Sequence, residues 1–323
     1  MWLFISKQDQ FATFARQEKN FWWIAAAVIT ITAAFVVSYF RWYQLANAIK
    51  LDLKFGQALR LGFIGAFFNV VAFGVMGGDS LRAFYAARER KDRIPEAILS
   101  VFIDRVIGLF VMFGFAGIAW QINRFLLSSG ESTEEQLAIA SICNTAGVLS
   151  ICGFLGLFLF LLFPGIRNWS LFGLFEKIPR VGGLIRQGID AATLYSKNKS
   201  VIGIAVICSI TTNLLFALTI WLVAQGVCDD APSAANHGVI APISMVANSI
   251  PLPGGVGGME VALSSMYESY KAKSGLIVAL CYRLCILLVS LMGWVVWLRH
   301  GRDVERHGPD ESVDSGKAGE VNR

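Results

Sequence analysis

The chain of 323 residues is poor in charge. Only 16% of its residues are Asp, Glu, Lys or Arg and 55% are hydrophobic, whereas a soluble domain averages about 25% charged and 45–50% apolar residues. This balance excludes a disordered chain. It also argues against two ordinary soluble domains, which the length alone would allow. The excess of apolar side chains needs an apolar solvent and therefore predicts a polytopic membrane protein.

Histidine and cysteine are also scarce. The three His and six Cys residues include no Cys-x-x-Cys pair and no spacing typical of a metal site. Five of the cysteines lie in apolar stretches, where a free thiol behaves as a small hydrophobic group. We therefore expect no disulfide, no metal and no cofactor. A nucleotide site is not expected either, because the Gly-Gly-Asp-Ser segment at 77–80 lacks the lysine of a P-loop.

Long stretches without charge dominate the sequence instead. A helix needs roughly 20 mostly apolar residues to cross a bilayer. By this measure the sequence predicts six spans, at about 21–40, 57–77, 96–121, 137–163, 201–226 and 275–299. Another apolar segment, 237–270, is interrupted by prolines and glycines and predicts either two spans or one re-entrant hairpin. The expected fold class is all-α, with about six transmembrane helices and a broken pair, or up to eight spans.

The remaining segments complete the predicted organisation. Residues 1–20 form an interfacial segment, 21–299 the transmembrane domain, and 300–323 a disordered polar tail. Within the domain, 165–199 is amphipathic and basic and is expected to lie as surface helices on an anionic leaflet. Lys and Arg number 17 in the loops of one predicted side and six on the other. Because basic loops stay cytoplasmic, both termini are predicted to be cytoplasmic.

The first polar feature of the apolar body is Gly77-Gly78-Asp79-Ser-Leu-Arg82. Asp79 and Arg82 are three residues apart and share a face if the segment is helical. The glycines allow either a turn or a close approach to another element. Two interpretations stay open: a polar site of headgroup size, or a glycine turn in which Asp79 caps the next helix.

A second feature is the adjacent pair Asp104-Arg105. Neighbouring helix residues diverge by about 100°, so each is expected to pair with a different helix. Arg82 and Arg283 are the available partners of Asp104. The alternative is that both residues lie at interface depth, with the Arg105 side chain extended toward the headgroups.

The third feature is the break between Pro251 and Glu260, followed by Arg283 in the last span. Pro251, Pro253, Gly254, Gly255 and Gly257 weaken the helix there. Non-helical backbone at membrane depth occurs only inside protein or beside a watery cavity. An intramembrane break is therefore favoured over a surface loop. Arg283 needs a counter-charge, for which Glu260 and Asp104 are the candidates.

In their order along the chain, these motifs resemble a known family. Gly-Gly-Asp-x-x-Arg, Asp-Arg-x-x-Gly-Leu, Pro-x-Pro-Gly-Gly-x-Gly-x-x-Glu and a late Arg are similar to the flippase-like family named for the transmembrane region of lysylphosphatidylglycerol synthase, also called multiple peptide resistance factor. The resemblance covers most of 21–299. It departs at 73–75, which are Phe-Gly-Val here, where the family often has Pro-Gly and a polar residue. The family also usually has one more span before the first.

The resemblance implies a stand-alone inner-membrane member without the synthase domain, built of α-helices with a re-entrant pair. Its best-known members move aminoacylated phosphatidylglycerol between leaflets. It implies that the substrate-binding residues are Gly78, Asp79, Arg82, Asp104, Arg105, Glu260 and Arg283. The re-entrant break would comprise Pro251, Pro253, Gly254, Gly255 and Gly257.

The function expected is therefore lipid translocation without enzymatic chemistry, by a protein of the cytoplasmic membrane whose partners are a phospholipid and the bilayer and include no nucleic acid. Two alternatives stay open: a membrane transferase acting on a lipid-linked substrate, and a non-transporting subunit of a lipid-modifying complex. The protein partners left open are a second copy of this chain and a separate lipid-modifying enzyme.

Overall fold

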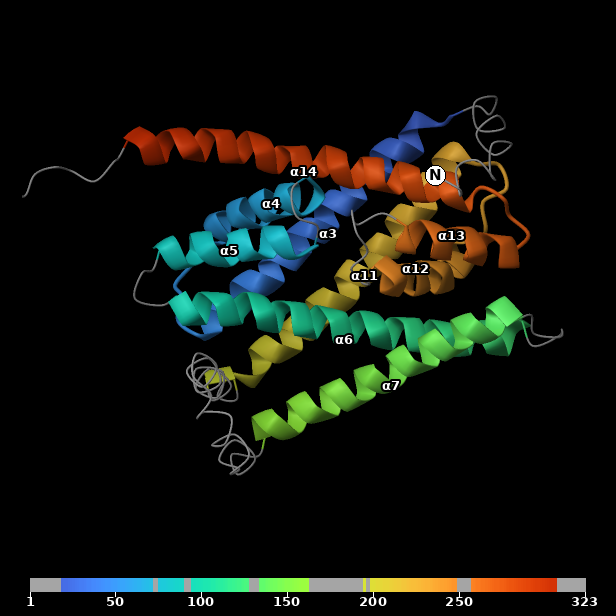
Figure 1. The fold of residues 1–323 in the computed structure, drawn as a ribbon, viewed down its shortest axis with the longest axis horizontal. Helices are drawn as coiled ribbons and strands as arrows, with labels where there is room; N and C mark the ends of the chain where they lie inside the picture. The colour runs from blue at the N-terminus through green and yellow to red at the C-terminus, as the bar shows by residue number, and fades with distance from the viewer. Residues whose placement is uncertain are drawn as a thin grey trace, which may run out of the picture.

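The computed structural model describes residues 19–71, 75–89, 94–127, 134–162, 194–195, 198–248 and 257–306. Over these ranges the chain is helical and contains no β-strand (Figure 1). The helices are α3 (Phe21–Ala48), α4 (Phe55–Val71), α5 (Val75–Glu89), α6 (Ile94–Leu127), α7 (Glu134–Leu162), α11 (Lys199–Val227), α12 (Ala234–Asn248), α13 (Gly258–Ser269) and α14 (Gly275–Arg306).

Five helices, α3, α6, α7, α11 and α14, are long and apolar enough to cross a membrane. Their outward faces carry large hydrophobic side chains, among them Ile29, Ile151 and Ile207, which are 71%, 69% and 64% exposed. Apolar surface on this scale is unfavourable in water, so hydrocarbon is the solvent that these faces suit. The prediction of an all-α polytopic membrane protein is confirmed.

Helices α4 and α5 form a hairpin instead of a membrane span. With 17 and 15 residues, they are about 26 and 23 Å long at about 1.5 Å per residue, short of the roughly 30 Å hydrocarbon core. The backbone of Gly78 in α5 lies against Gly65 in α4, where a methyl group would overlap the Gly65 carbonyl oxygen. The Gly78 N–H donates to Asn69 Oδ1 over 2.8 Å. The predicted span over 57–77 is therefore wrong, because the chain turns back after α4.

A second hairpin is made by α12 and α13, which have 15 and 12 residues. His237 Nε2, near the start of α12, lies 2.6 Å from the hydroxyl of Tyr267, near the end of α13. This hydrogen bond holds the outer ends of the two helices together. Of the two arrangements predicted for 237–270, the re-entrant hairpin is confirmed and the pair of spans is wrong.

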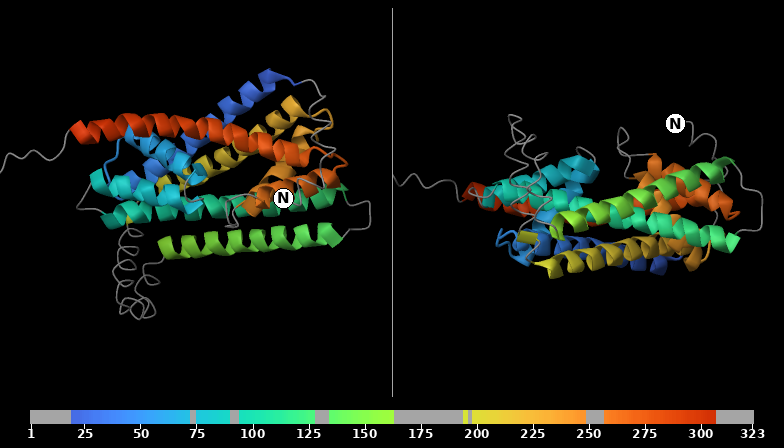
Figure 2. Two further views of the ribbon diagram at one scale, coloured as in Figure 1. Left: turned by 45° about the horizontal axis from the view of Figure 1, so that its top comes forward. Right: turned by 90° about the horizontal axis from the view of Figure 1, so that it is seen from below.

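The two hairpins enter the molecule from opposite ends (Figures 1 and 2). The Phe21 end, as we call it, contains the start of α3, the end of α11, the outer ends of α12 and α13, and the start of α14. The Arg306 end contains the end of α3, the outer ends of α4 and α5, the start of α6 and the end of α14. At the Phe21 end, Asp230 accepts hydrogen bonds from Lys273 N–H and from the Ser274 hydroxyl, over 2.7 and 2.6 Å.

The start of α3 and the end of α14 thus lie at opposite ends of the described helices, whereas the six-span arrangement would place them at the same end. The α4–α5 hairpin is the reason, since one predicted crossing does not take place. The basic balance changes little between the two arrangements, because 1–20 and 41–56 exchange sides and each contains three Lys or Arg residues. Arg41 and Arg82 are buried in α3 and α5; without them, the segments next to the Arg306 end contain 15 Lys and Arg residues and those next to the other end six.

Helix boundaries otherwise follow the predicted spans, with three extensions. Helix α3 continues to Ala48, past the expected end near residue 40, and α6 continues to Leu127, past the expected end near 121. Helix α14 continues to Arg306, into the segment predicted to be a disordered tail. The predicted interfacial segment 1–20, the surface helices over 165–199 and the tail beyond residue 306 lie largely or wholly outside the described residues.

Candidate functional site: two clusters of intramembrane charge

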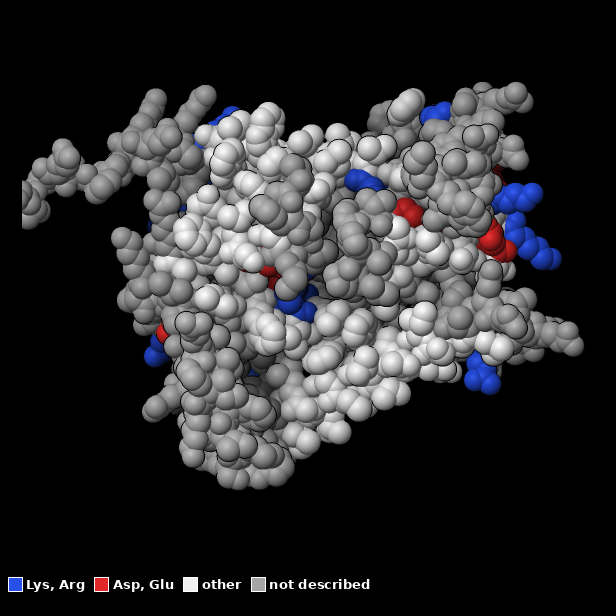
Figure 3. All heavy atoms as spheres, viewed as in Figure 1, with Lys and Arg blue, Asp and Glu red and all other residues white. Residues whose placement is uncertain are grey.

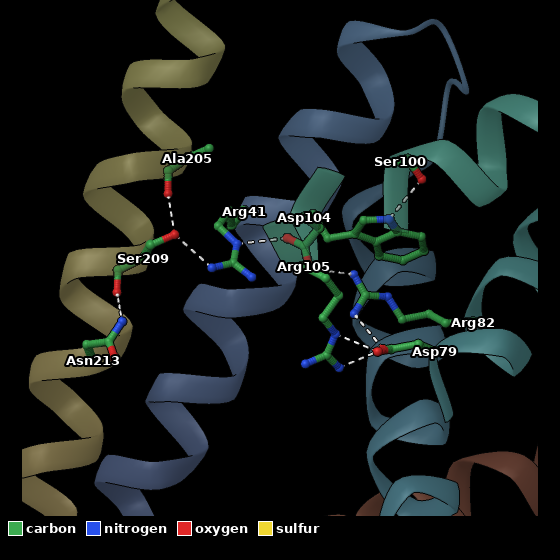
Figure 4. A network of polar contacts seen from close by, with 10 residues as sticks. Arg41, Asp79, Arg82, Ser100, Asp104, Arg105, Ala205, Ser209 and Asn213 are labelled. Carbon is green, nitrogen blue, oxygen red and sulfur yellow. Dashed lines mark hydrogen bonds and ion pairs between the residues drawn. The ribbon is translucent and has the colours of Figure 1, made fainter. Parts of the chain in front are cut away.

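The largest group of charges inside the helices is centred on Asp104 of α6, which is 1% exposed. Arg41 of α3 donates from Nε to Asp104 Oδ1 over 2.8 Å and from Nη1 to the Ser209 hydroxyl of α11 over 2.7 Å. Arg82 of α5 reaches the other carboxylate oxygen from Nη2 over 3.3 Å. One carboxylate therefore holds two buried arginines and joins three helices, as Figure 4 shows.

Asp79 and Arg105 extend this group toward the surface. Arg105 Nη2 of α6 donates to Asp79 Oδ1 of α5 over 2.7 Å. Arg82 Nη1 lies 3.8 Å from the same carboxylate oxygen. The side chain of Arg105 is 47% exposed and that of Asp79 only 16%. Among the charges of this group that the structure describes, the Arg105 guanidinium is thus the most accessible from outside the protein.

Aromatic and small residues hold these charges in place. The Arg82 guanidinium lies 4.1 Å from the centre of the Trp42 ring, a cation–π distance. The Trp42 indole N–H donates to the Ser100 hydroxyl over 3.1 Å. Gly108 leaves room for Arg41, because a methyl group at Gly108 would come within 2.9 Å of Arg41 Nη1. The site is therefore built by α3, α5 and α6 together with Ser209.

The five charges of this cluster do not cancel. Arg41, Arg82 and Arg105 face two carboxylates, Asp79 and Asp104, which leaves one positive charge. Ionisable groups at membrane depth are costly, with insertion scales giving about 2.5–3.5 kcal/mol for a central charge. An excess cation within apolar helices favours an anionic ligand. We call these five residues the inner charge cluster.

A second and smaller group joins the other hairpin to the last helix. Glu260 of α13 is 3% exposed and forms an ion pair with Arg283 of α14; the two also share a hydrogen bond of 3.2 Å from Arg283 Nη2 to Glu260 Oε2. The same oxygen accepts from the Gly257 N–H over 2.9 Å, so Glu260 also caps the start of α13. Gly257 has a φ of 125°, a conformation that favours glycine.

Several sequence alternatives are settled by this geometry. Gly78 serves a close helix approach, and Asp79 lies inside α5, so the interpretation of a glycine turn capped by Asp79 is wrong. Asp104 and Arg105 pair with different partners, as expected. Arg82 is the predicted partner of Asp104 that contacts it, whereas Arg283 pairs with Glu260. The predicted residues therefore fall into two clusters on two hairpins.

Arg41 and Ser209 are the site residues that the sequence did not reveal. Arg41 follows a charge-free stretch and stands among aromatic residues, so it suited the end of a span at headgroup level. In the structure α3 continues to Ala48, well beyond it, and Arg41 is 6% exposed. The available signal was the apolar pattern that continues after it, with Leu45, Ala46 and Ile49, all buried.

The predicted re-entrant break lies partly outside the described residues. Pro251, Pro253, Gly254 and Gly255 are not described, whereas Gly257 precedes the first turn of α13. The inner ends of α12 and α13 point toward the middle of the molecule (Figure 1). This placement favours an intramembrane break over a loop at the surface.

On the face drawn in Figure 3, most charged atoms of the described residues lie toward the two ends. Between the ends, the described part of this face is largely uncharged, with acidic and basic atoms close together at only a few places. Across the described ranges, no group of three or more His, Cys, Asp and Glu side chains is arranged to hold a metal ion. The chemistry that the described site offers is thus ionic recognition by arginines paired with carboxylates.

Comparison with known proteins bears on the same region of the chain. The family model described as "Lysylphosphatidylglycerol synthase TM region" matches residues 1–293. A protein of the archaeon Haloferax volcanii named "Glycosyltransferase AglD" is 24% identical over 265 residues, which are 75% of this chain. The chain spans only 42% of the length of that relative. No solved structure matches the chain.

Proposed function

This chain belongs to the family of the lysylphosphatidylglycerol synthase transmembrane region, and we propose on that premise that it moves a phospholipid between the two leaflets of a membrane. The lipid would carry a polar headgroup with a phosphate, with or without an attached amino acid. We place the protein in the cytoplasmic membrane, with the basic Arg306 end facing the cytoplasm. A second copy of the chain and a separate lipid-modifying enzyme remain its proposed protein partners.

One observation carries this proposal: the inner charge cluster contains one arginine more than it has carboxylates, and its most accessible member is Arg105. A charge of this kind inside apolar helices marks a substrate pathway more often than a structural contact. Arginine presents a planar fork of donors that matches the oxygens of a phosphate. A lipid phosphate can therefore neutralise the excess charge.

The way in which such a site would work follows from the exposure of its members. Asp104, Arg41 and Arg82 are buried, and their ion pairs fix the geometry of the site. Asp79 is the ion-pair partner of Arg105 when no ligand is present. An arriving headgroup phosphate competes with Asp79 for the Arg105 guanidinium, while its acyl chains stay in the hydrocarbon beside the apolar faces of the helices. The exchange of one anion for another keeps Arg105 paired throughout. The displaced Asp79 carboxylate keeps Arg82, whose Nη1 lies 3.8 Å from Asp79 Oδ1, so neither group is left without a counter-charge.

The two alternative functions can be distinguished by what each does to the lipids. The name of the Haloferax volcanii relative, a glycosyltransferase, is the reason to retain a transferase acting on a lipid-linked substrate as an alternative, although the chain covers less than half of that protein. A transferase acting on lipid would create a new lipid species, which mass spectrometry of the membrane lipids detects. A non-transporting subunit would produce neither a new lipid nor leaflet exchange on its own.

The proposal is tested by leaflet exchange in liposomes. The purified protein is reconstituted with fluorescent phosphatidylglycerol, its lysyl ester, or a zwitterionic lipid of the same chain length, and the fraction of probe that crosses is followed by bleaching of the outer leaflet. The wild type is expected to move at least one of these three probes between the leaflets faster than the probe crosses in empty liposomes. Arg105→Ala is expected to slow that exchange about tenfold or more, because it removes a hydrogen-bonded charge of about 1.5–3 kcal/mol.

Arg124→Ala is the matched control, because Arg124 is also an exposed arginine of α6 but stands near the opposite end of the helix. It is expected to leave exchange unchanged. Exchange no faster than in empty liposomes, for every probe, would overturn the proposal, and a new lipid species in the same samples would support the transferase instead.

A further inference from the structure

Helices α3 to α6 have the same order of elements as α11 to α14. Each set comprises a long helix, a hairpin of two short helices, and a second long helix. The first residues of the four elements are Phe21, Phe55, Val75 and Ile94 in one set, and Lys199, Ala234, Gly258 and Gly275 in the other. The separation along the chain is therefore nearly the same for every pair of equivalent elements, so the two sets run in step.

The packing between the two sets is reciprocal. Helix α4 packs on α14, and its counterpart α12 packs on α6. Helix α6 packs on α11, and its counterpart α14 packs on α3. The two leading helices, α3 and α11, pack on each other. Each of these contacts has its mate when the sets are exchanged, which is the pattern that a twofold pseudo-symmetry axis produces.

The direction of the two sets is opposite. The α4–α5 hairpin enters from the Arg306 end and the α12–α13 hairpin from the Phe21 end (Figure 1). Two repeats related in this way have inverted topology, and in membrane transporters such repeats place binding sites at their interface and exchange access between the two sides of the membrane. Among the described helices, α7 alone lies outside the repeat, and it packs on α6.

The charge pairs obey the same relation. Asp79 lies in the second helix of the first hairpin, and Arg105 in the long helix that follows. Glu260 and Arg283 occupy the equivalent elements of the second set, with nearly the separation along the chain that the helix starts show. In both pairs the carboxylate is largely buried and the arginine more exposed: the side-chain exposures are 16% and 47% in the first pair, and 4% and 30% in the second. A Gly-Gly dipeptide shortly precedes each carboxylate, at 77–78 and 257–258.

The depths of the two arginines are also comparable. Arg105 follows the start of α6 at Ile94 by about three helical turns, and Arg283 follows the start of α14 at Gly275 by about two. At roughly 1.5 Å per residue they lie about 17 and 12 Å along helices that run in opposite directions. Each arginine is therefore set back from a different end of the molecule.

We propose that the chain consists of two inverted repeats and that Glu260–Arg283 is a second headgroup site, which takes the phosphate of an anionic lipid from the leaflet at the Phe21 end as Asp79–Arg105 takes it from the leaflet at the Arg306 end. This inference rests on the proposed function for the identity of the ligand. It goes beyond the Arg105 site alone, because it gives each leaflet its own arginine and carboxylate.

The two sites differ in the charged residues that surround them. Asp79–Arg105 is backed by Arg41, Arg82 and Asp104, which give the inner charge cluster its net positive charge. In the second set, Leu263 follows the carboxylate as Arg82 does in the first, and Tyr282 precedes the arginine as Asp104 does; both are uncharged. The second set therefore lacks charges at the positions of Arg82 and Asp104, and its site is expected to hold an anionic headgroup less tightly than the Arg105 site does.

Leaflet-restricted photolabelling tests this assignment. The chain, with a tag after Arg323, is reconstituted in phosphatidylcholine vesicles, and capture on the tag separates vesicles by the orientation of the protein. A photoactivatable phosphatidylglycerol is added to the outer leaflet only, the vesicles are illuminated at once in the cold, and the labelled peptides are identified by mass spectrometry.

Labelling from the Arg306 end is expected on α5 and α6 and is expected to fall about tenfold in Arg105→Ala. From the Phe21 end it is expected on α13 and α14 and should fall similarly in Arg283→Ala, while each variant keeps the label of the other side. Arg283→Lys keeps the charge and should retain part of the label. Arg124→Ala, an exposed arginine near the Phe21 end of α6, is the control for attraction by any interfacial arginine.

Two results would overturn the second site: labelling of the same pair from both leaflets, or full labelling from the Phe21 end in Arg283→Ala. Photolabelling does not require that the lipid crosses, so the two proposals fail separately. Leaflet-specific labels without leaflet exchange would leave the second site standing and remove the transport function. Exchange with labels confined to α5 and α6 would do the reverse.

Discussion

At the scale of single residues, Asp104 determines whether the buried arginines are tolerated. Its carboxylate accepts from Arg41 and pairs with Arg82, and the side chains of these two arginines are only 7% and 4% exposed. Breaking a buried pair by removing one partner typically costs about 3–5 kcal/mol, because a charge is left without compensation. Asp79 has a more accessible partner in Arg105, which water and lipid headgroups can reach when the pair is broken.

Asp104→Asn is therefore expected to lower the midpoint of thermal unfolding in detergent much more than Asp79→Asn does. Both variants remove one negative charge and preserve the shape of the side chain, so each controls for the other. The loss for Asp104→Asn should approach about 3 kcal/mol or more, whereas that for Asp79→Asn should stay near the roughly 0–1 kcal/mol of exposed pairs. Equal destabilisation by the two substitutions would contradict the buried and accessible roles given to these carboxylates.

The residues of the site were predictable from the sequence to the extent that charge within an apolar stretch stands out. Asp79, Arg82, Asp104, Arg105, Glu260 and Arg283 all interrupt such stretches, and all are joined in ion pairs in the structure. Arg41 was missed because a cation at the end of an apolar stretch has an ordinary explanation at the interface. A helix that continues past its last charge-free residue carries that cation into the protein, and only the three-dimensional contacts reveal the partner.

At the scale of elements, the long helices could be predicted and one hairpin could not. A break with two prolines marked the α12–α13 hairpin, because proline removes a backbone donor. The α4–α5 hairpin has no proline: the sequence from 57 to 77 is apolar and uncharged except at Arg60, so it has the composition of a span. This hairpin is held by the close backbone approach of Gly78 to Gly65. The spacing of glycines in the sequence does not predict that contact.

The hairpin makes a topological prediction that the six-span arrangement does not. Lys54, before α4, should lie on the same side of the membrane as Lys199, at the start of α11, and on the opposite side from Lys273, before α14. All three are exposed. Single cysteines at these positions, in a variant without the native cysteines, are labelled with an impermeant maleimide in intact cells and in inverted vesicles.

Lys54→Cys and Lys199→Cys should react from the same side, and Lys273→Cys from the other. If α4 continued as a span, Lys54 and Lys199 would instead report opposite sides. The absolute assignment follows from the same data: reaction of Lys273→Cys in intact cells agrees with a cytoplasmic Arg306 end, while reaction of Lys199→Cys there reverses the proposed orientation.

At the scale of the whole molecule, the inverted relation between α3–α6 and α11–α14 places the two charge clusters at equivalent positions of the two sets. In sequence, the two sets share a Gly-Gly dipeptide shortly before an acidic residue, and the hydrophobic stretches of any membrane protein resemble one another. The repeat becomes visible only in the reciprocal packing of α4 on α14 and of α12 on α6. A headgroup crossing between two such sites uses them in series, so the loss of either one blocks the same path.

Transport through two sites in series is tested most directly by the initial rate of anionic-lipid exchange in liposomes for the wild type, Arg105→Ala, Arg283→Ala and the double variant. We expect exchange by the wild type above that of empty liposomes, a loss of about tenfold or more in each single variant, and no further loss in the double variant. A wild type no faster than empty liposomes, or an Arg283→Ala variant that exchanges lipid at the wild-type rate, would contradict transport through two sites in series.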